Sequence, residues 1–241
     1  NILKDLGYYN TTIDISVIDS KNNLVDIIFN INLGKKAKIK KITFIGNKIF
    51  KDKKLRNIIA SNEYKFWKFI SGRKYLNQNI VFLDERLLKN FYKNNGYYNV
   101  QINSSFAKLI DDSNFELIFN IDPGPRFFFG ELNISLPSDF DKKNFTSIEK
   151  LFKKIKGKPY SINTIDKILD EIDSITTLEQ YKFIKANVSE NINQNLINFQ
   201  FNVEEGEKFY VDRINIDYSK ILPPFGRTAA KRSTPVRWTF W

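Results

Sequence analysis

Apolar residues occupy every second position in residues 13–17 and again in residues 25–31, on either side of the polar segment 20–23. Such alternation around a polar turn is typical of an antiparallel hairpin, because successive side chains of a strand point to opposite faces. The pattern therefore predicts a β-hairpin near the start of the chain, with one buried face and one solvated face.

Two further copies of this pattern follow at similar spacing. Each copy has an aromatic-rich stop, two alternating stretches around a polar turn, and a glycine-containing connector that leads into another apolar stretch. The connector glycines Gly34, Gly124 and Gly206 lie 90 and 82 residues apart. Self-similarity at a nearly fixed period indicates an array of small modules. Because the first and last copies are incomplete, we expect the chain to be an internal fragment of such an array.

Between each connector and the next hairpin, apolar residues recur at the spacing of helices. Residues 52–59 predict a short helix, and residues 80–95 predict a longer one that stops at Gly96 and Tyr97. The next repeat shows the same pair, with Ser161 as the predicted cap of its longer helix. Each complete unit then has the order β-α-α-β-β. The predicted fold class is α+β, with three-stranded sheets that two helices cover on one face.

The pattern also divides the chain. The predicted divisions are 1–36, the C-terminal part of a repeat; 37–124 and 125–206, two complete repeats; 207–222, the first strand of a further repeat; and 223–241, an atypical tail. The tail holds three arginines and two of the three tryptophans of the chain, without strand or helix periodicity. We therefore expect it to be artefactual or disordered, and we exclude it from the fold.

Two kinds of connection stand out within the repeats. Gly46 and Asn47 follow the first strand of the first complete repeat, and such a pair suits positive φ angles in a turn. The long segment between the two helices of that repeat contains Phe66, Trp67 and Phe69. A long loop rich in aromatic residues is either a packed lid or a surface that contacts a partner, and the sequence leaves both open.

The composition argues against most enzyme classes. The chain has no cysteine and no histidine, which removes the commonest metal ligands, the usual base of a catalytic triad and all disulfides. No phosphate-binding glycine loop appears, and the carboxylates lie in turns, connectors and helix surfaces. We therefore expect a binding module without cofactor, metal or small-molecule substrate.

The net charge of +11 leaves two interpretations. A solvated lysine-rich surface explains it, as does a weak attraction to anionic surfaces. A nucleic-acid-binding repeat protein is an alternative that would show a steep dependence of affinity on salt. No aromatic motif of a single-strand RNA binder is present, so we expect no nucleic-acid partner.

Four stretches resemble the POTRA domain, and in particular the POTRA arrays of outer-membrane protein assembly factors. They are ITFIGNKIFKDKKLRNII, LDERLLKNFYKNNGYYNVQI, LVDIIFNINLGKK and FQFNVEEGEKFYVDRINI. The resemblance covers roughly residues 1–217 and implies the end of a second POTRA domain, a third, a fourth and the start of a fifth. Pro123 and Pro125 depart from the acidic-glycine connector of the family.

The resemblance implies a place and partners. The place is the periplasmic face of the outer membrane of a Gram-negative bacterium. The partners are unfolded outer-membrane proteins, accessory lipoproteins and a C-terminal membrane barrel of the same protein. A POTRA array of a related translocation or two-partner secretion transporter is the alternative within this resemblance.

The predicted architecture offers one candidate site. A three-stranded sheet leaves an edge whose backbone N–H and C=O groups an extended peptide can join. We expect the first strand of each hairpin to be that edge, with alternate side chains shaping pockets. In the first complete repeat these are Tyr98, Val100, Ile102, Ser104 and Phe106. An edge blunted by lysine, asparagine or a neighbouring repeat is the alternative.

Overall fold

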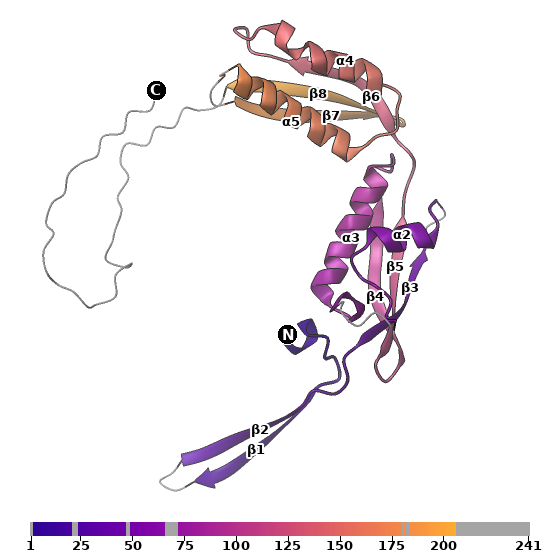
Figure 1. Ribbon diagram of the computed structural model, residues 1–241, viewed down its shortest axis with the longest axis vertical. Coiled ribbons are helices and arrows are strands. Elements are labelled where there is room, and N and C mark those ends of the chain that lie inside the picture. The colour runs from indigo at the N-terminus through magenta and orange to yellow at the C-terminus, as the bar shows by residue number, and fades with distance from the viewer. Residues whose placement is uncertain are drawn as a thin grey trace, which may run out of the picture. The chain divides into compact units, whose positions relative to one another are not determined.

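The computed structural model describes residues 2–20, 24–46, 49–65, 72–179, 181 and 184–205. Several predictions lie outside the described residues: Asn47, Gly206, the aromatic residues Phe66, Trp67 and Phe69, the predicted strand 207–222 and the tail 223–241. Within the described part, a two-stranded hairpin precedes two repeats that each contain a three-stranded sheet and helices (Figure 1).

The hairpin follows one turn of helix. Its elements are α1 (Ile2–Asp5), β1 (Thr12–Ser20) and β2 (Leu24–Asn32). The antiparallel register runs without interruption from Thr12 opposite Asn32 to Ser20 opposite Leu24, which confirms the predicted hairpin. The prediction of one buried face is wrong, because every residue of both strands is exposed, including Phe29 at 58%. Among the described residues, no third strand pairs with this hairpin.

The first complete repeat has the predicted order β-α-α-β-β. Its elements are β3 (Lys38–Ile45), α2 (Asp52–Ile58), the short 3₁₀ helix η1 (Gly72–Lys74), α3 (Gln78–Lys93), β4 (Gln101–Asp111) and β5 (Asn114–Asp122). The strand order is β3-β5-β4, with β5 parallel to β3 and antiparallel to β4. α3 begins two residues before the predicted start, because the side chain of Asn77 accepts a hydrogen bond from Ile80 N at 3.1 Å.

Alternation along the central strand decides which face the helices cover. Phe115, Leu117, Phe119 and Ile121 of β5 are buried, whereas the residues between them are partly exposed. The buried set packs with Leu55 of α2 and with residues of α3, so both helices lie on one face of the sheet (Figure 1). Each buried side chain of this size contributes about 1.5–3 kcal/mol.

A buried carboxylate holds the connection that follows α2. Asp84 of α3 has no exposed surface, and its Oδ1 accepts hydrogen bonds from Ala60 N at 2.6 Å and Ser61 N at 3.1 Å. These two N–H groups lie just beyond the end of α2, where the backbone has become extended and the N–H groups need another acceptor. Asp84 therefore ties the end of the short helix to the long one.

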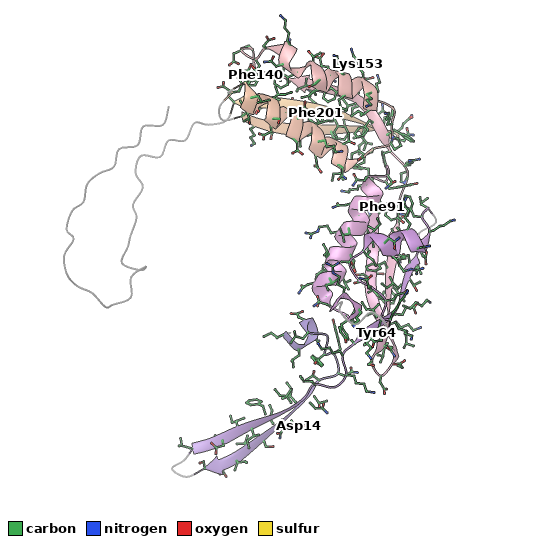
Figure 2. The ribbon with its side chains drawn as sticks, viewed as in Figure 1. Asp14, Tyr64, Phe91, Phe140, Lys153 and Phe201 are labelled. Carbon is green, nitrogen blue, oxygen red and sulfur yellow. The ribbon has the colours of Figure 1, made fainter. Side chains whose placement is uncertain are left out.

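The second repeat repeats the architecture. Its elements are β6 (Phe128–Ser135), the 3₁₀ helix η2 (Lys142–Phe145), α4 (Thr146–Ile155), α5 (Ile162–Leu178), β7 (Ile184–Asn193) and β8 (Leu196–Glu205). The strand order β6-β8-β7 matches that of the first sheet. Phe129, Phe201 and Ile148 form the centre of its core, and Phe140 closes one end by stacking on Tyr181 at 3.7 Å (Figure 2).

One asparagine of the first repeat caps a helix of the second. Ser161 is the first cap residue of α5, as predicted, but its side chain makes no capping bond to the helix. Instead Asn94 Oδ1 accepts from Asn163 N at 2.9 Å and from Ser161 Oγ at 2.9 Å. Asn94 itself ends α3. The acceptor that a capping residue normally supplies is therefore provided by the preceding repeat.

We expect Asn94→Ala to loosen the first turn of α5 by about 1 kcal/mol, the usual value of a helix cap. Hydrogen exchange at the Asn163 amide should become about fivefold faster. Asn95→Ala is the matched control, because the Asn95 side chain donates to Phe91 O at 2.7 Å within its own helix end. Similar exchange at Asn163 in both variants would contradict the cap.

Candidate functional site: the sheet edges

Each sheet has one edge that its own chain closes. On β3, Ile39 O accepts from Tyr64 N at 2.6 Å, and just before the strand Ala37 O accepts from Leu76 N at 2.9 Å. Figure 2 labels Tyr64, which lies beside this strand. The two ends of the aromatic segment 61–79 thus pack along β3, whereas its middle lies outside the described residues.

β6 is closed in the same way by the connection between α4 and α5. Phe129 N donates to Lys158 O at 2.9 Å, and Phe129 O accepts from Gly157 N at 2.8 Å. Phe127 O, directly before the strand, accepts from Tyr160 N at 3.0 Å. Strand addition at β6 would therefore have to displace bonds that the chain already makes.

The opposite edges, β4 and β7, are open. Across the described part of the chain, no strand pairs with the outer side of either one, and no hydrogen bond is recorded to their outward backbone groups. β4 has 11 residues and β7 has 10. In an antiparallel ladder, every second residue of an edge strand directs its N–H and C=O away from its neighbour. Both strands thus present rows of unused donors and acceptors.

The two open edges differ in regularity. The register of β7 with β8 runs from Ile184 opposite Glu205 to Asn193 opposite Leu196 without a break. The register of β4 shifts twice, between Ile102 and Ser104 and again near its end. β-Bulges twist an edge and interrupt its hydrogen-bonding row, so β7 is the straighter template. The sequence predicts the first strand of each hairpin as an edge and favours β4, because the bulges leave no clear signal in the hydrophobic pattern.

The bulge also changes which β4 side chains point outward. Ile102 is half-buried against the core of the repeat, whereas Ser104 and Phe106 are exposed, Phe106 at 47%. Past the bulge it is Ser105 that turns toward the helices, where its hydroxyl donates to Glu85 of α3. The predicted row of alternate side chains is therefore wrong at Ile102, because one inserted residue reverses the alternation.

Two other residues of the predicted row are not in the strand. β4 begins at Gln101, and Val100 is buried in the core at 6% exposure. Tyr98 packs edge-on against Phe127 and Tyr160 of the second repeat, with ring centroids 5.8 and 5.1 Å away. Both residues follow the stop of α3, so the chain is still turning there. The prediction of Tyr98 and Val100 as edge residues is wrong.

Tyr98 serves the contact between repeats instead. Its hydroxyl donates to Glu190 of β7. Burial, and to a lesser extent this carboxylate, raises the pKa of Tyr98 to about 12, so the hydroxyl keeps its proton at neutral pH.

The predicted turn residues lie where the chain reverses. Gly46, Gly96 and Gly124 all have positive φ angles. Tyr97, next to Gly96, is buried and meets the ring of Tyr92 at 5.8 Å. The first repeat thus uses Tyr97 for its own core.

In the described ranges, no group of three or more acidic side chains is placed to hold a metal ion. Two shallow hollows flank α4, one toward α5 and one toward β6. Over the same residues, no helix has the length and apolar character that crossing a membrane requires.

Comparison with known proteins finds similarity to POTRA proteins. The family model for POTRA, described as a surface antigen variable number repeat, matches residues 37–124. The outer membrane protein assembly factor BamA of Neisseria meningitidis serogroup B is 28% identical over 213 residues, which cover 87% of this chain and 26% of that protein. The protein of the same name from Buchnera aphidicola subsp. Acyrthosiphon pisum is 25% identical over 217 residues, covering 87% and 34%.

Among solved structures, POTRA domains 3–5 of Haemophilus influenzae BamA match with a TM-score of 0.49 and 12% identity, over 85% of this chain and 76% of that one. The chain spans about a quarter to a third of the length of the curated relatives described above. The first complete β-α-α-β-β repeat is the part of the chain that the POTRA family model matches. Over most of its length the chain is similar to part of the outer membrane protein assembly factor BamA.

Proposed function

We propose that this segment binds extended stretches of unfolded outer-membrane proteins by adding them as a further strand to its open sheet edges. The observation that carries the proposal is the asymmetry of each sheet. The outer edges of β3 and β6 are closed by hydrogen bonds from their own chain, whereas the outer edges of β4 and β7 have no partner among the described residues. Backbone pairing reads little of the side-chain sequence, which suits a protein that handles many β-rich clients.

Between the two open edges, β7 is the stronger candidate. Its ladder with β8 is regular over ten residue pairs, so a client strand can pair along its whole length. Lys185 and Glu190 are the charged residues of β7, and the other residues are neutral. On β4 the usable length is shorter, because the bulge near Ile102 interrupts the row. We therefore place primary capture on β7 and a weaker site on β4.

The proposal predicts a specific pattern of backbone protection. A synthetic peptide with alternating apolar and polar residues should slow hydrogen exchange at every second amide of β7, because only alternate N–H groups face outward. The remaining β7 amides already bond to β8 and should change little. Amide-resolved exchange measured by NMR with and without peptide tests this.

The control peptide has the same side chains and N-methyl groups on alternate backbone nitrogens, which removes the donors that pairing needs. It should give no protection. Equal protection by both peptides would show that side chains, and not the sheet edge, hold the client. Protection confined to the helices would also contradict the proposal.

The similarity to BamA supports a setting for this function. We propose that the segment lies on the periplasmic face of an outer membrane, carries a membrane barrel at its C-terminal side, acts without catalysis, and also contacts accessory lipoproteins. A photoreactive residue at the exposed Phe106 position, within the full-length protein in its envelope, distinguishes the partners. Crosslinks to nascent β-barrel chains support client binding at β4, and crosslinks to one lipoprotein alone identify this edge as a scaffold.

A further inference from the structure

A run of lysines leads into β3. Five of the seven residues 35–41 are lysine. Lys41 Nζ lies 2.8 Å from Glu116 Oε1, so its charge is compensated within the repeat. Lys40 helps to lower the pKa of Asp111, after the hydrogen bonds from Asn114 and Ser113.

Lys36 and Lys38 have a different environment. The Lys36 ammonium lies 5.1 Å from the ring centre of Tyr8 and 5.3 Å from that of Tyr75, and the Lys38 ammonium lies 4.7 Å from that of Tyr64. Neither lysine has a carboxylate within salt-bridge distance among the described residues. Both are half-buried, so the rings hold two uncompensated positive charges in place.

The carboxylate next to this cluster is already engaged. Glu63, which precedes Tyr64, accepts from Ile42 N at 3.1 Å and faces Arg56 at 3.9 Å. The Tyr64 ring also lies 5.3 Å from the ammonium of the buried Lys74. Glu63 is thus engaged by partners other than Lys36 and Lys38.

The geometry of the pair indicates the shape of a ligand. Ala37 and Ile39 are buried in the core, so Lys36 and Lys38 point to the opposite side of the chain from them. Side chains two residues apart in extended chain repeat about every 6.6–6.8 Å, which is also the spacing of alternate side chains in any other extended peptide. A single phosphate, as in a lipid headgroup, does not have this repeat.

We propose that Lys36 and Lys38, held by Tyr8, Tyr64 and Tyr75, form a docking site for an extended acidic segment of a protein partner with carboxylates at alternate positions. The site lies on the β3 side of the sheet, across from the open β4 edge, so it serves a different ligand from strand addition. Because the aromatic rings already restrict the lysine side chains, binding loses less side-chain entropy than it would on free surface lysines.

The test uses the whole chain, a capped peptide of repeating Glu-Thr, and isothermal titration at low and moderate salt. Lys36→Gln/Lys38→Gln should weaken binding about tenfold, as expected for the loss of two ion pairs. Lys40→Gln/Lys41→Gln is the matched control, because it removes the same charge from the same run and should change binding by less than about twofold. Lys36→Arg/Lys38→Arg should restore affinity.

Two further probes separate the alternatives. A peptide of the same composition with all glutamates contiguous should bind more weakly, since fewer of its carboxylates match the lysine spacing. Vesicles of phosphatidylcholine and phosphatidylglycerol test a lipid headgroup as the ligand. Three outcomes would each overturn the proposal. The two glutamine variants could lose affinity equally, or the two peptides could bind equally well. Lys36→Gln/Lys38→Gln could also weaken binding to vesicles but not to the peptide.

Discussion

Gly46→Ala is expected to lower the free energy of unfolding of the first repeat by roughly 3 kcal/mol or more. Gly46 has a φ angle of 73°, where an L side chain costs about 1–2 kcal/mol. An added Cβ would also lie 2.5 Å from Ile121 O and 2.9 Å from Asn120 Oδ1. Ile121 belongs to the central strand β5, which is bonded on both sides, so its backbone has little room to move. Such overpacking adds about 1–3 kcal/mol.

Gly124→Ala separates the two contributions. Gly124 has a φ angle of 63°, but an added Cβ would come no closer than 3.8 Å to any atom, at Asn99 Cβ. Gly124→Ala should therefore lower the free energy of unfolding only by the conformational cost of about 1–2 kcal/mol. Urea denaturation of both variants, with hydrogen exchange to assign the loss to residues 37–124, measures the difference. Equal losses would mean that the contact with β5 relaxes at no cost.

The sequence determines the fold of each repeat because its signals are local. Alternation in the hairpins, helical spacing before Gly96, and the glycine connectors specify element type and order without tertiary contacts. The β-α-α-β-β order and the three-stranded sheets were predicted on this basis and are confirmed. Element ends shift by a few residues where a cap decides them, as Asn77 does for α3.

The details of the candidate site depend on longer-range interactions. The bulge near Ile102 depends on how β4 pairs with β5, and no residue type in β4 predicts it. Tyr98 looks like a strand residue in sequence, yet it contacts Tyr160 and Glu190 of the next repeat. Likewise, alternation predicts a buried face for β1 and β2, but burial requires a covering layer that the described residues do not contain. An alternating apolar pattern shows that a strand can pack on one face, but tertiary contacts decide whether that face is buried.

Asp84→Ala is expected to destabilise the first repeat by about 3 kcal/mol or more. The substitution leaves two buried N–H groups, those of Ala60 and Ser61, without their acceptor, and each such loss costs about 1–3 kcal/mol. It also removes a side chain that has no exposed surface, which leaves a cavity. The end of α2 and the start of segment 61–79 should lose protection in hydrogen exchange first. Unchanged protection there, with a stability loss elsewhere, would contradict this role.

Asp84→Asn tests the charge apart from the hydrogen bonds, since asparagine keeps the Oδ1 acceptor and replaces Oδ2 with a neutral amide. Burial raises the pKa of Asp84, although hydrogen bonds from Ser61 and Ala60 oppose the shift. A raised carboxyl pKa means that the folded state favours the proton. The stability from this group is therefore fully present below the pKa of an unfolded aspartate, about 3.9, and is lost as the pH rises through the folded pKa.

The asparagine variant has no such loss, so its stability relative to the native chain should increase from acidic to neutral pH. A difference between the two chains that does not vary with pH, in urea denaturation between about pH 4 and pH 8, would mean that burial does not raise this pKa.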